Sequence, residues 1–226
     1  MAAACILIPA YNAEKTILAV VQECLQHGLP VVVVDDGSAD GTAGMVAGLP
    51  VALLRHGQNL GKGAALKTGF AWAIASGFDA VVTIDADGQH DVSAIPKLIA
   101  SAQNGRWGIL IASRHTQFEQ MAGLRKIWNR IGVWCIWKRT GFEITDSQSG
   151  FRYYSREILK EISLESNGYA LEMEILLKAW KRGFTVGSLP IAARVADGRA
   201  TSHYRPFKDT ASISMTFLRN MRRGSC

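Results

Sequence analysis

Two aspartates follow an apolar run near the middle of the chain. The run spans residues 80–84, and Asp85 and Asp87 come next with one alanine between them. Every second side chain of an extended segment points the same way, so we expect these carboxylates to face one side. Such a pair favours a hard divalent cation with oxygen ligands, which usually also holds substrate phosphates. The alternative is a solvated, aspartate-rich turn that closes a strand.

A second acidic pair also follows an apolar run. Residues 31–34 are four valines, and Asp35 and Asp36 come directly after them. An acid at the carboxyl end of a strand can accept hydrogen bonds from a base or a ribose hydroxyl. We predict that Asp36 (or Asp35) faces a ligand. Asp40, together with Thr42, is interpreted as a structural helix cap.

A glycine-rich segment lies between the two acidic pairs. Gly61, Lys62 and Gly63 match half of a dinucleotide-binding fingerprint, but Leu66 replaces the third glycine. A Walker A loop is excluded because no serine or threonine follows the lysine. We expect a loop in which Lys62 and backbone amides approach a phosphate. The alternative is a loop that only begins a helix.

The elements that must position these residues alternate between strand and helix. Short apolar runs predict buried strands, and helical periodicity predicts helices between them. The predicted strands are residues 6–8, 31–34, 51–54, 80–84 and 109–112, and the predicted helices are 13–27, 40–47, 63–76 and 93–103. This order predicts an α/β fold of Rossmann-like type, with a mostly parallel mixed sheet flanked by helices. At 226 residues one domain is expected.

Charge and composition narrow the function classes. Residues 1–100 carry a net charge of −4 and residues 101–226 a net charge of +10, which suggests a metal–nucleotide site beside an anionic or membrane-facing region. No stretch of 18 apolar residues predicts a transmembrane helix, and no secretion signal is recognised at the N-terminus. The four cysteines lack metal-binding spacing, which argues against a zinc site and a disulfide framework and favours a reducing compartment.

Two segments of the basic half are amphipathic. Residues 118–139 place Trp128, Trp134 and Trp137 among arginines and lysines, and residues 206–223 repeat the pattern with phenylalanines and arginines. Such segments fit helices that lie in a lipid headgroup layer. The alternative is a helix that packs in a core or a subunit interface, with a merely solvated basic face.

Several motifs occur in order along the chain: Pro9-x-Tyr11-Asn12, Asp35-Asp36-Gly37-Ser38, Gly61-Lys62-Gly63-x-Ala65, Asp85-Ala86-Asp87-Gly88-Gln89, Ser113-Arg114, residues 146–152 and residues 172–176. Together they resemble family 2 glycosyltransferases of the GT-A fold, a family that inverts the anomeric centre. The resemblance runs from residue 5 to about residue 205, and its downstream motifs resemble the branch that transfers mannose or glucose to dolichyl and other polyprenyl phosphates. It implies a nucleotide-sugar-binding half over residues 1–115 and an acceptor-binding half over residues 116–226.

The resemblance implies a role for each matching residue. Pro9, Tyr11 and Asp36 would line the nucleoside pocket of a UDP- or GDP-linked sugar. Asp85, Asp87 and Gln89 would hold Mg²⁺ or Mn²⁺ and the donor diphosphate. Asp146 and Gln148 would order the floor of the active site. The candidates for the acceptor phosphate are Arg114, Arg125 and Arg152.

The sequence departs from the family pattern at two places. The family acid directly follows the asparagine, whereas here Ala13 intervenes before Glu14, which leaves the sugar or base contact of Glu14 open. Near the end, Arg194 and His203 stand at longer spacing than the family's arginine and lysine. His203 would then replace a phosphate-binding lysine and make binding pH-sensitive near neutrality. The alternative for His203 is an ordinary surface histidine.

The resemblance implies an enzyme at the inner face of the cytoplasmic membrane, with the two amphipathic segments docked on lipid. A polyprenyl phosphate is already ionised, so arginines would position it without a general base. One alternative is transfer to a saccharide or lipid hydroxyl, for which Asp146 would take the proton. A non-catalytic nucleotide-sugar-binding scaffold is a further alternative. A nucleic-acid binder is disfavoured because the tryptophans lack a strand platform.

Overall fold

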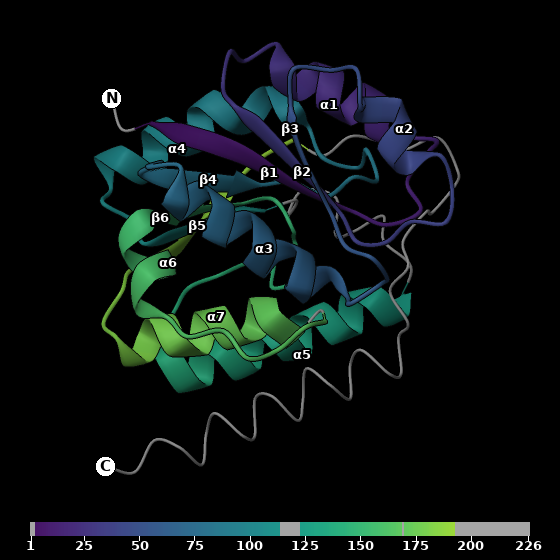
Figure 1. The fold of residues 1–226 in the computed structure, drawn as a ribbon. Helices are drawn as coiled ribbons and strands as arrows, with labels where there is room; N and C mark the ends of the chain where they lie inside the picture. Colours follow the sequence, from purple (N-terminus) through teal and green to yellow (C-terminus); the bar gives the residue numbers. More distant parts are fainter. Residues whose placement is uncertain (1–2, 114–122, 169, 193–226) are drawn as a thin grey trace.

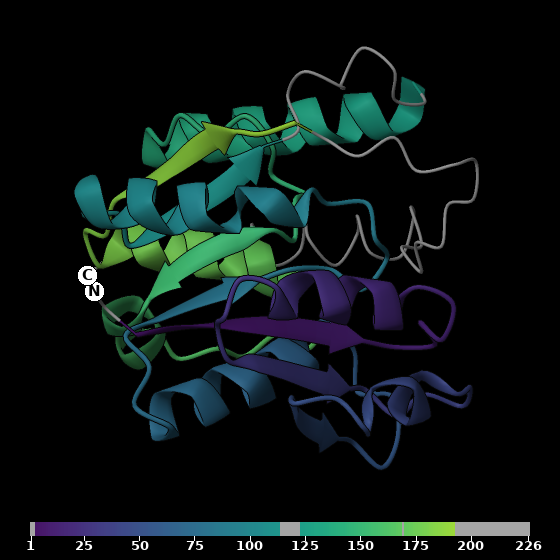
Figure 2. The same cartoon turned by 90° about the horizontal axis from the view of Figure 1, so that it is seen from above.

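The computed structural model describes residues 3–113, 123–168 and 170–192, and within them the strands form one seven-stranded sheet. The strand order is β3-β2-β1-β4-β6-β5-β7 (Figure 2). The strands are β1 (Ala4–Ala10), β2 (Val31–Asp35), β3 (Ala52–Arg55), β4 (Ala80–Thr83), β5 (Ile109–Ser113), β6 (Arg152–Ser155) and β7 (Val186–Pro190). Only β6 runs antiparallel to its neighbours, so the predicted mostly parallel mixed sheet is confirmed.

Helices cover both faces of this sheet (Figure 1). One face carries α1 (Ile17–Leu25), α2 (Thr42–Val46), the 3₁₀ turn η1 (Val92–Ala94) and α4 (Ile95–Asn104). The other carries α3 (Lys62–Ala75), α5 (Gly123–Thr140), α6 (Arg156–Glu161) and α7 (Ala170–Lys181). The strands supply both cores because their side chains alternate: Ile6 and Ile8 face the first group of helices, and Cys5 and Leu7 face the second. The sandwich of three layers leaves the carboxyl ends of the parallel strands open for a site.

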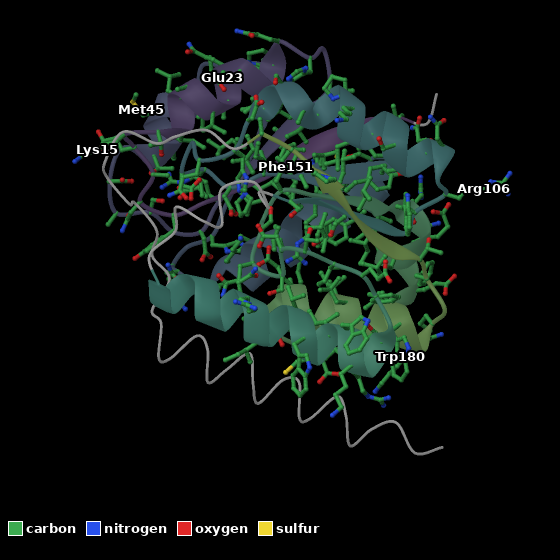
Figure 3. All side chains as sticks on the ribbon, turned by 180° about the vertical axis from the view of Figure 1, so that it is seen from behind. Lys15, Glu23, Met45, Arg106, Phe151 and Trp180 are labelled. Atoms are coloured by element: carbon green, nitrogen blue, oxygen red, sulfur yellow. The ribbon has the colours of Figure 1, made fainter. Side chains whose placement is uncertain are left out.

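Helices α5 and α7 lie side by side beneath the sheet (Figure 1). The Arg139 guanidinium of α5 stacks at 4.2 Å from the centre of the Trp180 ring of α7, and Figure 3 labels Trp180 on this helix pair. A cation over a tryptophan face is attractive, so this contact helps to hold the pair together. No helix among the described residues is long and apolar enough to cross a membrane.

The boundaries differ from the prediction in informative places. Helix α1 begins at Ile17, four residues after the predicted start, because the preceding loop makes turns in which Asn12 has a φ of 48°. The amide of Ala13 donates to the Thr42 side chain at 2.8 Å, which fixes that loop against α2. Helix α5 (Gly123–Thr140) covers the described part of the helix predicted over 118–139, and residues 118–122 and 206–223 lie outside the described part of the chain.

Candidate active site

The acidic loop follows β4 at the carboxyl edge of the sheet. Strand β4 ends at Thr83 and residues 86–87 form a turn, so the prediction that Asp85 and Asp87 share one extended segment is wrong. The Asp87 Oδ1 accepts the backbone amide of Gln89 at 3.0 Å. Both acids are half-buried in this turn. The loop therefore presents two carboxylates and a glutamine within five residues, through turn geometry instead of strand alternation.

Asp85 is surrounded by positive or proton-donating side chains. The Nζ of Lys62 lies 2.7 Å from Asp85 Oδ1, and the Nε2 of His90 lies 3.5 Å from Oδ2. Burial alone raises the pKa of Asp85, but the charge of Lys62 and the contact with His90 outweigh it, so the pKa lies well below its usual range. The carboxylate is thus ionised and depends on nearby positive charge.

His90 is held at this point by packing. Its side chain is buried, and its ring meets the Phe151 ring edge-on with centroids 5.6 Å apart. Figure 3 shows Phe151 near the middle of the molecule. No role was predicted for His90 from the sequence, although it directly follows the predicted metal motif. Phe151 lies in the loop directly before β6, and this tertiary contact cannot be read from residue spacing.

The loop before β6 approaches Asp85 from the other side. The Thr83 Oγ1 donates to the carbonyl of Gly150 at 2.8 Å, which fixes the loop against β4. A Cβ atom at Gly150 would overlap the Asp85 carboxylate, so only glycine lets the loop come this close. Gly150 therefore sets the position of Asp85, a role that was not predicted from the sequence.

Arg152 holds the loop that precedes β6, and its predicted contact with an acceptor phosphate stays a prediction. Its side chain is fully buried, with Nε donating to Ser149 O at 2.7 Å and Nη2 donating to Ser147 O at 2.9 Å. Nη1 donates to Glu172 O at 3.3 Å. Three of the five guanidinium N–H donors are thus used on backbone carbonyls. The guanidinium fixes the 146–150 loop to α7.

Arg152→Met is expected to destabilise the fold by about 3 kcal/mol. The substitution leaves two buried carbonyls and one partly buried carbonyl without donors, and each unsatisfied buried group costs about 1–3 kcal/mol before relaxation. Urea unfolding measures the change, with Arg182→Met as the control because Arg182 is exposed. An unchanged unfolding midpoint for Arg152→Met would show that the guanidinium does not hold this loop.

Asp146 and Gln148, which were predicted to order the floor of the site, are joined by a hydrogen bond within one loop. The side chain of Asp146 is fully buried, and its Oδ1 accepts the Gln148 amide at 3.0 Å. The next residue, Ser147, donates its amide to Asn129 Oδ1 on α5 at 3.0 Å. The loop is therefore fixed from two sides, and Asp146 orders it from within.

Asp36 makes several contacts within the chain, and its predicted contact with a nucleoside stays a prediction. Asp36 is only 2% exposed and accepts the amides of Leu60 and Gly61 at 3.0 and 2.7 Å. Its Oδ1 also lies 2.6 Å from His56 Nδ1. These contacts hold the loop that precedes α3, so Asp36 helps to position Lys62, the first residue of that helix. Asp40 is structural as predicted, since its Oδ1 accepts the amide of Thr42, the first residue of α2, at 3.0 Å, although the N-cap residue itself is Gly41.

The predicted nucleoside residues lie around the end of β1. Pro9 is buried in the strand and Tyr11 is half-buried in the loop that follows it. Glu14 is exposed, and its Oε2 accepts the Gly41 amide at 3.2 Å. Glu14 therefore binds the loop before α2, which gives it a partner within the chain.

The loop before α7 supports Lys62 from the opposite direction. The backbone of Asn167 packs closely against Gly61 and Gly63, and its carbonyl accepts the Ala64 amide at 3.0 Å. The Glu174 side chain orders this loop by accepting the amides of residues 165 and 166 at 2.9 and 2.8 Å. Burial raises the pKa of Glu174, but its hydrogen bonds from Lys178 and from these amides outweigh burial and lower the pKa overall.

Glu174→Gln is expected to cost about 2 kcal/mol of unfolding free energy at neutral pH, because charge-assisted hydrogen bonds are lost. The lowered pKa means that this contribution is complete above the ordinary value of 4.5 and is lost as the pH falls through the folded pKa. Urea unfolding of wild type and variant, repeated at several pH values between about 2 and 7, measures the difference in unfolding free energy. A difference that stays constant down to the acid end would contradict this account.

Several predicted residues cannot be placed in this site. Arg114, Arg194 and His203 lie outside the described residues, as does the side chain of Arg125 on α5. Glu172 belongs to the site, since its Oε1 lies 3.3 Å from Lys62 Nζ. No role was assigned to it from the sequence. The sequence feature that could have identified Glu172 is its position in the motif at residues 172–176.

Comparison with known proteins gives one family. Residues 5–163 match the model described as Glycosyl transferase family 2. The chain is 34% identical over 209 residues to the UDP-N-acetylglucosamine–dolichyl-phosphate N-acetylglucosaminyltransferase of Methanococcus voltae, covering 82% of this chain and 83% of the relative. It is 29% identical over 205 residues to the polyprenol monophosphomannose synthase of Mycolicibacterium smegmatis, covering 82% and 75%.

Solved structures share the fold. The glucosyl-3-phosphoglycerate synthase of Mycobacterium tuberculosis in complex with UDP superposes with a TM-score of 0.74 at 20% identity, covering 97% of this chain and 80% of the other. The same enzyme with Mn²⁺ and UDP-glucose gives a TM-score of 0.72. At this identity the likeness concerns the fold, and it confirms the predicted GT-A architecture.

Proposed function

Because the chain belongs to glycosyltransferase family 2 and is a hexosyltransferase, we propose that it transfers a sugar from a UDP- or GDP-linked donor to a polyprenyl phosphate. The transfer would use Mg²⁺ or Mn²⁺ and invert the anomeric centre. The observation that carries the proposal is the half-buried, ionised Asp85, placed beside Asp87 at the carboxyl edge of the sheet. Residues 1–115 would bind the donor, and residues 116–226 would bind the acceptor.

The acidic loop fits an open metal site. Within the part of the chain that the structure describes, no three His, Cys, Asp or Glu side chains gather into a closed metal cage. Asp85, Asp87 and Gln89 offer oxygen ligands only, and Mg²⁺ is commonly bound by one or two carboxylates together with substrate phosphates. A bound cation would neutralise the charge that develops on the leaving diphosphate. Asp85 already requires positive charge beside it, which agrees with this role.

The burial of Asp146 favours a phosphate acceptor over a hydroxyl acceptor. A general base must reach the proton that it removes, and Asp146 is fully buried with Oδ1 bound to the Gln148 amide. The oxygen of a polyprenyl phosphate is already ionised and needs no base. The relatives whose names specify dolichyl phosphate or polyprenol monophosphomannose act on the same chemical class.

Two other functions remain as alternatives. Transfer to a saccharide or lipid hydroxyl would require Asp146 to take a proton, so Asp146→Asn would lower the rate by orders of magnitude if this alternative held. A non-catalytic nucleotide-sugar-binding scaffold would bind the donor without turnover. Both acids of the metal motif are present, which disfavours the scaffold.

Helix α5 offers a surface for membrane binding. Ile131, Trp134 and Trp137 are 45%, 54% and 54% exposed, and Lys138 lies 5.0 Å from the centre of the Trp134 ring. Exposed tryptophans beside basic residues suit a lipid headgroup layer. This surface supports a peripheral location on the inner face of the cytoplasmic membrane, where a polyprenyl acceptor is available.

Replacing Trp134 and Trp137 together with serine is expected to weaken binding to anionic lipid vesicles by about tenfold or more, since two amphipathic rings leave the interface. Vesicle co-sedimentation measures the change. Trp72→Phe serves as the control, because Trp72 lies on α3, not on α5, and its ring packs against Phe78. Unchanged vesicle binding by the double variant would remove α5 as the docking surface.

The donor site is tested by thermal shift of the purified protein with UDP, GDP and their sugar conjugates, each with and without Mn²⁺. We expect one nucleotide to raise Tm only when the metal is present, because a ligand that binds the native state stabilises it. The same nucleotide should not raise the Tm of Asp87→Ala. No shift with any nucleotide would contradict the proposed donor site.

A further inference from the structure

Lys62 lies where a metal ion on Asp85 would have to compete with it. Its Nζ is 2.7 Å from Asp85 Oδ1 and 3.3 Å from Glu172 Oε1, and its side chain is 15% exposed. Lys62 is the first residue of α3, and Glu172 lies in the first turn of α7. One ammonium group therefore bridges two carboxylates that come from different parts of the fold.

The backbone of Lys62 is fixed on both sides. The Gly61 amide donates to Asp36 Oδ2 at 2.7 Å, and the Ala64 amide donates to the Asn167 carbonyl at 3.0 Å. Because these bonds hold the start of α3, the lysine can leave Asp85 only by moving its side chain. A long, flexible lysine side chain is suited to such a movement.

Charge makes the two cations exclusive at Asp85. An ammonium and a divalent ion that share one carboxylate repel each other, and the repulsion is strong in a partly buried site. Glu172 is nearly buried, with a side chain only 8% exposed, so it keeps Lys62 near the site when Asp85 is taken. An incoming diphosphate would supply a second anion for the displaced ammonium.

We propose that Lys62 is the built-in counter-ion of Asp85 and makes metal binding depend on the donor nucleotide. Without nucleotide, Lys62 neutralises Asp85 and disfavours the metal. With nucleotide, the diphosphate receives Lys62, and the metal takes its place on Asp85. This inference rests on the proposed metal site at Asp85 and Asp87, and it adds an order to the assembly of that site.

The test compares Mn²⁺ binding by wild type and Lys62→Gln without nucleotide, using the electron paramagnetic resonance signal of free Mn²⁺. We expect the variant to bind Mn²⁺ at least about fivefold more tightly, and we expect UDP or GDP to tighten Mn²⁺ binding by a smaller factor than in wild type. Lys67→Gln is the matched control. It removes the same charge from the same helix, but Lys67 bonds to Asn167 and to no carboxylate of the site.

Equal Mn²⁺ affinities of wild type and Lys62→Gln would overturn the inference and leave the proposed function intact. If wild type binds no Mn²⁺ with any nucleotide, the metal site fails and the inference fails with it. If Lys62→Gln does not fold, the inference can still be tested on the wild-type protein alone. Amine labelling followed by mass spectrometry should show Lys62 becoming more reactive in saturating Mn²⁺ while Lys67 stays constant, and unchanged labelling of Lys62 would contradict the displacement.

Discussion

Asp87→Ala is expected to lower kcat/KM for sugar transfer by about 10²- to 10³-fold or more, while the protein stays folded. The substitution removes one of the two carboxylates proposed to hold the divalent cation, and losing one preorganised electrostatic contact costs about that much. The half-buried side chain of Asp87 accepts a hydrogen bond from the Gln89 amide of its own loop, so the fold should tolerate its loss. Steady-state kinetics over a range of Mn²⁺ concentrations measures the effect.

Asp91→Ala is the control for this experiment. Asp91 lies four residues further along the same loop and caps η1, where its Oδ1 accepts the Ser93 amide at 3.1 Å. Removing this cap should cost about 1 kcal/mol of stability and leave transfer activity nearly unchanged. Equal losses of activity in Asp87→Ala and Asp91→Ala would indicate a general effect of loop charge instead of a specific ligand.

Gly150→Ala is expected to reduce activity by about 10²-fold, because a new Cβ would push the Asp85 carboxylate away from Lys62 and His90. A misplacement of about 1 Å at a reacting centre can cost that much. The same measurement should show a weaker response to Mn²⁺, since the displaced group is the proposed metal ligand.

Gly44→Ala is the matched control for the glycine substitution. Gly44 lies in α2, and a Cβ there meets nothing within 4 Å. Alanine in a helix stabilises by about 0.5–1 kcal/mol relative to glycine, so activity should persist and Tm should not fall. Full activity in Gly150→Ala would show that the loop and Asp85 can separate without consequence.

The local hydrophobic pattern of the sequence was sufficient to predict the strands in the first half of the fold. The apolar runs that become β1, β2, β4 and β5 are continuous because helices bury them on both faces, so their strand character is visible in the sequence. Strand β6 was not predicted because it begins with Arg152, which is buried only through the carbonyls around it. Strand β7 contains a glycine and ends in a proline, and it is stabilised by pairing with β5.

The residues that carry the acidic chemistry were visible, but their partners were not. Asp85 and Asp87 were identified from their position after an apolar run. The structural contacts of Asp36 and Arg152 were not predicted, because both side chains form hydrogen bonds with backbone atoms that are distant in sequence. His90 packs against Phe151 from the loop before β6, and Glu172 comes from α7; tertiary contacts of this kind have no local signature.

The most direct test of the proposed function is a transfer assay with purified protein, Mn²⁺, labelled UDP- and GDP-sugars, and two acceptors. One acceptor is a polyprenyl phosphate, and the other is the polyprenol of the same chain length, which offers a hydroxyl. We predict transfer to the phosphate with one of the donors, dependence on the divalent cation, and substantial activity remaining in Asp146→Asn. Transfer to the hydroxyl alone, abolished by Asp146→Asn, would contradict the proposed acceptor.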